Sequence, residues 1–191
     1  MTSVAIAVSV LLAPASLIWP LLPAMGLAFA AYLHLLANKA APRCDEPAQA
    51  SVAWLLLAQL PHLGELALSG FLSRWPVLYG EPPYPAGVFF GFALGAYVLL
   101  SACMAAWFQR RCHLALLPLL VLALFGGCGS ALVHAGWAWR QGGYVPGLGT
   151  ALLQGLAGWL ALRRLSGSPR AASLLAFACV PGAAVTLLPT H

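Results

Sequence analysis

The chain has 191 residues, of which 62% are hydrophobic and only 7% charged, and nine Lys and Arg against four Asp and Glu give a net charge of +5. A water-soluble domain of this length needs many more polar residues to cover its core, so the composition excludes an ordinary soluble protein and indicates a membrane protein. The basic residues are spread among apolar runs and form no patch of the kind that binds nucleic acid.

The first apolar stretch, residues 1–38, carries no Lys, Arg, Asp or Glu and is interrupted by three prolines. It is too long for one membrane span and slightly short for two. We expect a single span at about 16–38 preceded by an interfacial leader, and the alternative is a tight hairpin that turns at 19–23. The absence of a basic start argues against a cleaved signal peptide. Residues 1–50 are therefore predicted to form an N-terminal hydrophobic span and a cytoplasmic loop.

Residues 51–191 are predicted to form the main helix bundle. A helix rises about 1.5 Å per residue, so about 20 apolar residues cross a hydrocarbon core of roughly 30 Å. Five segments fit, at about 51–70, 86–108, 114–137, 146–162 and 171–189. The predicted fold is all-α: a polytopic transmembrane helix bundle of five core spans plus the N-terminal span or hairpin.

The basic residues predict the orientation of this bundle. Seven lie in the connections 39–50, 109–113 and 163–170, whereas only Arg74 and Arg140 lie in the alternate connections. Because cytoplasmic loops carry an excess of Lys and Arg, these three connections are expected in the cytoplasm. We expect an integral protein of the bacterial inner (plasma) membrane, whose immediate partner is the lipid bilayer.

An ionisable pair lies within the first core segment. His62 and Glu65 are three residues apart, so a helix presents both on one face. An isolated carboxylate in hydrocarbon is costly by several kcal/mol, so Glu65 must be paired, protonated or in contact with water. Either the two side chains satisfy each other within the bundle, or they form the centre of a site.

A second polar group of residues surrounds the connection between the third and fourth core segments. His134 ends one apolar run, Arg140 and Tyr144 lie in the short connection, and Thr150 follows one turn into the next helix. If both helices rise outward, His134 and Glu65 differ in depth by roughly 9 Å, which helix tilt or a kink at Pro61 would have to close. We predict that His62, Glu65 and His134 line one polar pocket in the outer half of the bundle.

The two stretches "HLGELALSGFLSRWP" and "SALVHAGWAWRQGGYVPGLGTALL" resemble the two signatures of the HXXEE-domain membrane proteins, over about residues 52–162. The resemblance places the histidines of that pattern at His62 and His134 and its first glutamate at Glu65, and it matches the turn at 144–150. Leu66 replaces the second glutamate and Ser130 replaces an asparagine. The resemblance implies a candidate active site of unknown activity.

Three classes of function remain open at this stage. The first is an intramembrane enzyme that acts on a lipid-like or small substrate, with His62, Glu65 and His134 as catalytic residues and with Arg140, Tyr144 and Thr150 binding the substrate. The same two histidines and glutamate would also suit a divalent metal such as zinc. The second is a non-catalytic module that binds or conducts a small solute, and the third is a structural subunit with a degenerate site and unknown partner subunits.

Overall fold

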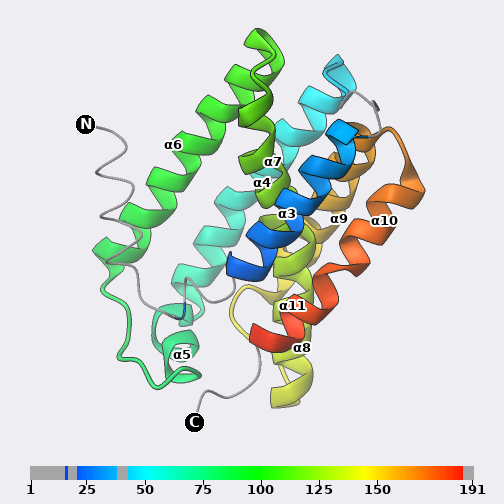
Figure 1. Cartoon of the computed structure of the whole chain (residues 1–191). Coiled ribbons are helices and arrows are strands. Elements are labelled where there is room, and N and C mark those ends of the chain that lie inside the picture. The colour runs from blue at the N-terminus through cyan, green and yellow to red at the C-terminus, as the bar shows by residue number, and fades with distance from the viewer. Residues whose placement is uncertain (1–15, 17–20, 38–42, 187–191) are drawn as a thin grey trace.

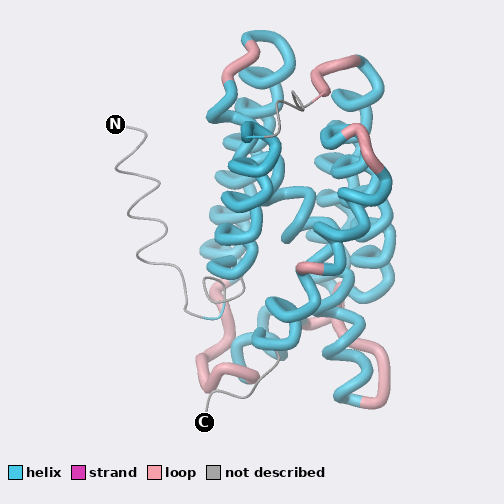
Figure 2. The backbone as a smooth tube through the Cα atoms, turned by 45° about the vertical axis from the view of Figure 1, so that its right-hand side comes forward, coloured by secondary structure: helices cyan, strands magenta, loops and turns pink. Residues whose placement is uncertain are grey.

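The computed structural model describes residue 16 and residues 21–37 and 43–186, and these described residues form helices and no strands. The helices run side by side in one elongated bundle, and most of the loops between them lie at its two ends (Figures 1 and 2). In chain order the elements are α3 (Leu21–Ala37), α4 (Glu46–Leu68), α5 (Phe71–Val77), α6 (Ala86–Arg110), η1 (His113–Ala115), α7 (Leu116–Val121), η2 (Leu122–Gly129), α8 (Ser130–Gln141), α9 (Leu148–Ser166), α10 (Pro169–Phe177) and α11 (Cys179–Thr186).

Within the described residues, three stretches are long and apolar enough to cross a membrane: Glu46–Leu68, Ala86–Arg110 and the continuous run His113–Gln141. The other apolar segments form shorter or interrupted helices. Helix α3 has 17 residues, and a turn at Ala178 separates α10 from α11. The leader considered for the N-terminal stretch lies outside the described residues, as do residues 19 and 20 of the alternative hairpin turn at 19–23, whereas residues 21–23 begin α3.

Helix α4 carries the ionisable pair, and its ends follow from local sequence. The Asp45 side chain accepts a hydrogen bond from the backbone N–H of Ala48 at 2.9 Å, with Pro47 in the first turn. Both are favourable at a helix start, where backbone donors lack partners. The helix continues through Pro61 to Leu68, and His62 is one of its buried residues. The helix starts five residues before the predicted segment 51–70 and ends two residues before its predicted end.

The third core segment is a single helical run that changes its winding. Residues Leu122–Gly129 adopt a π-helix between α7 and α8. A π-helix is wider than an α-helix and is uncommon outside functional sites, because it is less favourable than the α form. This segment contains Gly126, Gly127 and Gly129. Because glycine has no side chain, the widened run can approach its neighbours closely.

The closest approach joins η2 to α9. A Cβ built on Gly127 would lie 2.6 Å from the Cα of Gly158, and one built on Gly158 would lie 2.6 Å from the carbonyl oxygen of Ala123. The two backbones are therefore in direct contact. This contact fixes α9, and with it the residues at the start of α9, against the run that carries Ser130 and His134.

Gly127→Ala should lower the free energy of unfolding by about 1–3 kcal/mol, because the added methyl group must push two backbones apart. Gly64→Ala in α4 is the matched control, since a Cβ there meets nothing within 4 Å. That control should be neutral or stabilising by up to about 1 kcal/mol, as alanine favours helix over glycine. Unfolding by denaturing detergent, followed by circular dichroism, measures both variants. Equal stability of the two would contradict the close contact.

Helix α5 was not expected, because the sequence here reads as an outer loop rich in Pro, Gly and aromatic residues. Gly70 takes a left-handed conformation (φ 85°), which turns the chain out of α4. Phe71 and Trp75 then stack one turn apart, with ring centroids 5.6 Å apart, and both are buried. They pack with Trp137 of α8, so these aromatic residues form a core at this end rather than a surface belt.

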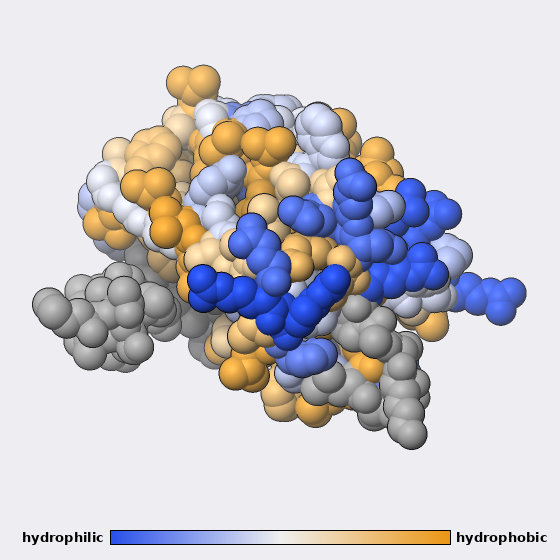
Figure 3. Space-filling model, turned by 90° about the horizontal axis from the view of Figure 1, so that it is seen from above, coloured by the Kyte–Doolittle hydropathy of each residue, from blue (hydrophilic) through white to orange (hydrophobic). Residues whose placement is uncertain are grey.

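The exposed arginines of the three predicted cytoplasmic connections gather at the opposite end of the bundle. Arg43 is tied there by its backbone N–H to the carbonyl of Leu165 (3.0 Å), and the Arg111 guanidinium donates to the carbonyl of Cys44 (3.1 Å). Figure 3 looks onto this end and shows its hydrophilic side chains together. The exposed arginines of the three connections are Arg43, Arg110, Arg111, Arg163, Arg164 and Arg170. The connections predicted to share one side of the membrane therefore share one end of the molecule.

Candidate functional site

Glu65 lies near the end of α4, where four donors from the α8–α9 connection and the start of α9 surround its carboxylate. The backbone N–H groups of Gly149 and Thr150 donate to it at 3.1 and 2.8 Å. The hydroxyls of Tyr144 and Thr150 donate to it as well. The backbone donors belong to the first turn of α9, where N–H groups have no partner within the helix. Glu65 therefore caps α9, which accounts for a carboxylate in an apolar bundle.

Thr150 connects Glu65 to His62. Its Oγ1 lies 2.8 Å from His62 Nδ1 and also donates to Glu65 Oε2. A carboxylate accepts only, and a hydroxyl has one proton. When that proton points to Glu65, His62 Nδ1 must be the protonated nitrogen that donates to Thr150. The Nε2 atom of His62 then keeps its lone pair.

The other side of His62 faces α8. Ser130 Oγ lies 3.5 Å from His62 Nε2, and the ring of His134 meets that of His62 edge-on with centroids 5.2 Å apart. Both histidines are buried, each with 6% of its surface exposed. His134 therefore reaches the His62 and Glu65 site, despite the difference in depth expected between His134 and Glu65.

Gly147 explains why the three elements meet so closely. Its φ is 85°, and a Cβ there would lie 2.8 Å from His134 Cε1 and 3.0 Å from His62 Cε1. The connection can therefore turn into α9 only if residue 147 has no side chain. Pro146 precedes this turn, and α9 begins at Leu148, two residues later than the sequence suggested.

No family model, curated protein or solved structure matches this chain. The site must therefore be interpreted from its own geometry.

The structure brings together five of the six residues selected from the sequence: His62, Glu65, His134, Tyr144 and Thr150. Arg140 lies exposed in the last turn of α8, four residues before Tyr144. At this end of α8 the arginine that packs on the aromatic core is Arg74, whose guanidinium lies 5.8 Å from the Trp137 ring centroid.

The zinc alternative does not fit this arrangement. Among the residues described, no group of three or more His, Cys, Asp or Glu side chains is placed to hold a metal ion. The chemistry of the donors gives the reason: the Glu65 oxygens and His62 Nδ1 already have hydrogen-bond partners within the protein. A metal would have to displace the bonds that hold α9 in place.

Buried polar atoms without a hydrogen-bond partner also occur close to the network, on His134, Trp137 and Gln154. The Pro146 carbonyl accepts a hydrogen bond from the His134 ring, while His134 Nδ1 has none. Gln154 follows Thr150 by one turn of α9, is fully buried, and has neither side-chain atom bonded. An unpaired buried polar group costs about 1–3 kcal/mol.

Sequence reasoning did not select Gln154, Gly147 or Ser130 as functional. Gln154 had a usable signal, since it lies four residues from Thr150 in an otherwise apolar run and so shares its helix face. Ser130 had been regarded only as the loss of a family asparagine. Its distance to His62 depends on the π-helix before it, which no sequence pattern indicated.

Tyr144 should ionise at higher pH than an ordinary tyrosine, because its hydrogen bond to the Glu65 carboxylate raises the pKa of its phenol. A raised folded-state pKa stabilises the protein fully below the unfolded pKa of about 10 and loses that contribution as the pH rises through the folded value. Phenolate absorbance of the wild type minus that of Tyr144→Phe measures this titration. A midpoint at or below pH 10 would contradict the bond. The substitution should cost about 1 kcal/mol or less near neutral pH, since Tyr144 is 57% exposed.

Proposed function

We propose that this protein is an integral membrane protein of the HXXEE kind whose site, at the outer end of the bundle, uses His62 as a general base on a lipid-like or small substrate. The observation that carries the proposal is the chain of hydrogen bonds from Glu65 through Thr150 to His62. It leaves His62 Nε2 as a buried acceptor with a free lone pair. Proton transfer by a positioned histidine is worth about 10²–10⁴ in rate.

The roles within the pair differ from the simplest reading of the sequence, in which both His62 and Glu65 transfer protons. Four donors hold Glu65 as an anion. It therefore acts as a positioning residue that fixes the tautomer of His62 through Thr150 and stabilises the imidazolium that forms. His134 lies against the His62 ring and contributes its unpaired Nδ1 to binding.

The wider arrangement in the membrane is part of this proposal. Helices α3 and α9 and the interrupted pair α10–α11 are the remaining spans beside the three long ones, giving five core spans and one N-terminal span. The arginine-rich end faces the cytoplasm of a bacterial inner membrane, because positive charge is retained on that side. The site then opens toward the outer leaflet.

Cysteine labelling of intact cells tests this orientation. Pro83→Cys and Gly143→Cys, both at exposed positions of the outer connections, should react with a membrane-impermeant maleimide before permeabilisation. The natural Cys112 is exposed at the arginine-rich end and serves as the internal control. It should react only after permeabilisation, and peptide mass spectrometry assigns each adduct. Labelling of Cys112 in intact cells, with protection of 83 and 143, would reverse the topology.

Turnover in a bilayer tests the function. The full chain in nanodiscs, supplied with a total lipid extract of bacterial membranes, should convert one class of component, detected by mass spectrometry. His62→Gln should reduce that conversion at least 100-fold. His113→Gln, an exposed histidine at the far end, is the matched control and should be fully active. Absence of any conversion by the wild type, or conversion that does not depend on His62, would refute the proposal.

A structural role is the second candidate, and one observation favours it: Glu65 caps the first turn of α9. Under this role Glu65→Gln would lower stability and change nothing else. Under the proposed function it leaves the protein folded and reduces turnover. Glu46→Gln, at the exposed start of the same helix, controls for loss of a negative charge. Measuring stability and turnover on the same samples separates the two roles.

A further inference from the structure

The geometry points to Ser130 as a nucleophile and to a carboxylic ester with an apolar acyl group as the substrate class. This inference rests on the proposed function, because it requires His62 to act as the base. It begins from a hydroxyl that faces the free nitrogen of that histidine: Ser130 Oγ lies 3.5 Å from His62 Nε2.

The proton count fixes the direction of that contact. Thr150 gives its only hydroxyl proton to Glu65, so His62 Nδ1 carries the ring proton and Nε2 is an acceptor. Ser130 is consequently the donor. The chain of groups thus runs from a carboxylate through a bridging hydroxyl and an imidazole to a serine hydroxyl. This is the order of groups that activates a serine as a nucleophile. A distance of 3.5 Å is long for a formed bond, and such contacts commonly shorten when substrate binds.

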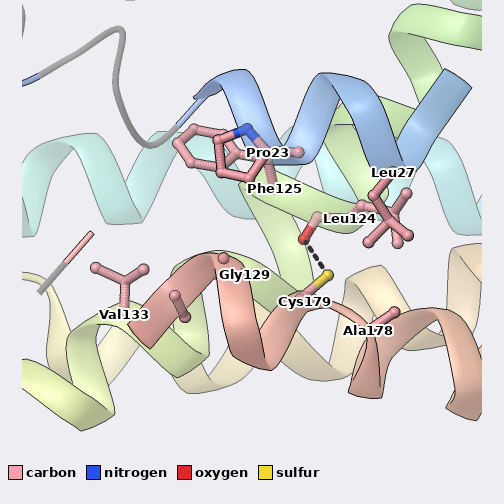
Figure 4. A pocket seen from close by; sticks show the side chains of 11 residues that line it. Pro23, Leu27, Leu124, Phe125, Gly129, Val133, Ala178 and Cys179 are labelled. Carbon is pink, nitrogen blue, oxygen red and sulfur yellow. Dashed lines mark hydrogen bonds between the residues drawn. The ribbon is translucent and has the colours of Figure 1, made fainter. Parts of the chain in front are cut away.

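The fold gives Ser130 an unusual place. It is the first residue of α8, directly after the π-helix η2. Its neighbour Gly129 and Val133, one turn later, line an apolar cavity of about 50 Å³ between η2, α8, α3 and α11. Figure 4 shows these two residues on one wall of the cavity, with Pro23 and Leu27 of α3 across from them. One turn of helix therefore presents a hydroxyl to the histidine and an apolar surface beside it, which suits an ester linked to hydrocarbon.

The reaction balances with water as the second reactant. Ser130 Oγ bonds to the ester carbonyl carbon as its proton moves to His62 Nε2. The bond from that carbon to the alkoxy oxygen breaks, and His62 returns the proton to the departing alcohol. Water then attacks the acyl-serine carbonyl and gives a proton to His62. As the carbon–Ser130 bond breaks, that proton returns to Ser130 Oγ and the carboxylic acid leaves.

A fluorophosphonate probe, which phosphonylates activated serines, tests the inference on the full chain in nanodiscs. The wild type should form one adduct, mapped to Ser130 by peptide mass spectrometry. Ser130→Ala should form none, and His62→Gln should react at least 100-fold more slowly. The control Ser101→Ala, a partly buried serine in α6 whose hydroxyl bonds to the Tyr97 carbonyl, should react like the wild type. Thermal unfolding of each variant establishes that it is folded.

The same experiment also distinguishes failure of this inference from failure of the proposed function. No adduct in the wild type, an adduct at another serine, or labelling of Ser130 that is independent of His62 would overturn Ser130 as the nucleophile. If lipid conversion still depends on His62 in that case, the proposed function stands without Ser130. If conversion is absent as well, both fail.

Discussion

Gly147→Ala should destabilise the protein by about 3 kcal/mol and abolish His62-dependent turnover. Two effects add. A left-handed conformation at φ 85° costs alanine about 1–2 kcal/mol. The new methyl group would also lie 2.6 Å from Leu66 Cδ2 and within 3.0 Å of both histidine rings, which is overpacking of the kind that costs about 1–3 kcal/mol. The histidines must move apart to accommodate it.

Gly142→Ala isolates the first effect. Gly142 ends α8 with a φ of 65°, and a Cβ there meets nothing within 4 Å. It should lose about 1–2 kcal/mol through backbone conformation alone and keep its turnover. Unfolding by denaturing detergent and the lipid conversion assay, applied to both variants, provide the comparison. Equal losses of stability and equal activity would mean that the contact between Gly147 and the histidines is not tight.

The sequence predicted the all-helical fold and the three long apolar stretches of the described residues because their signal is local. In a bilayer every backbone polar group needs a partner, and a long uncharged run meets this need within itself by forming a helix. The spacing of His62 and Glu65 likewise required only that α4 be a helix. Their meeting with Tyr144 and Thr150 followed from the order of the segments and the shortness of the connection between α8 and α9.

The parts that could not be predicted depend on contacts between segments distant in the chain. Thr150 was chosen as a substrate-binding residue, but its hydroxyl joins Glu65 to His62 because Gly147 turns α9 toward α4. The π-helix arises where Gly127 meets Gly158, thirty-one residues later, and no pattern within residues 122–129 specifies it.

Thr150→Val should separate the two functions of the network. Valine has nearly the shape of threonine but no hydroxyl, so His62 Nδ1 loses its acceptor while the backbone donors of Gly149 and residue 150 stay on Glu65. The cap on α9 is therefore retained, and the unpaired imidazole N–H costs about 1–3 kcal/mol. Turnover should fall about 100-fold, because the tautomer that leaves Nε2 free is no longer fixed. Thr150→Ser restores the hydroxyl and should restore most of the rate. If valine and serine at this position gave the same turnover, the hydroxyl bridge would have no part in the chemistry, and Glu65 would serve only to hold the start of α9.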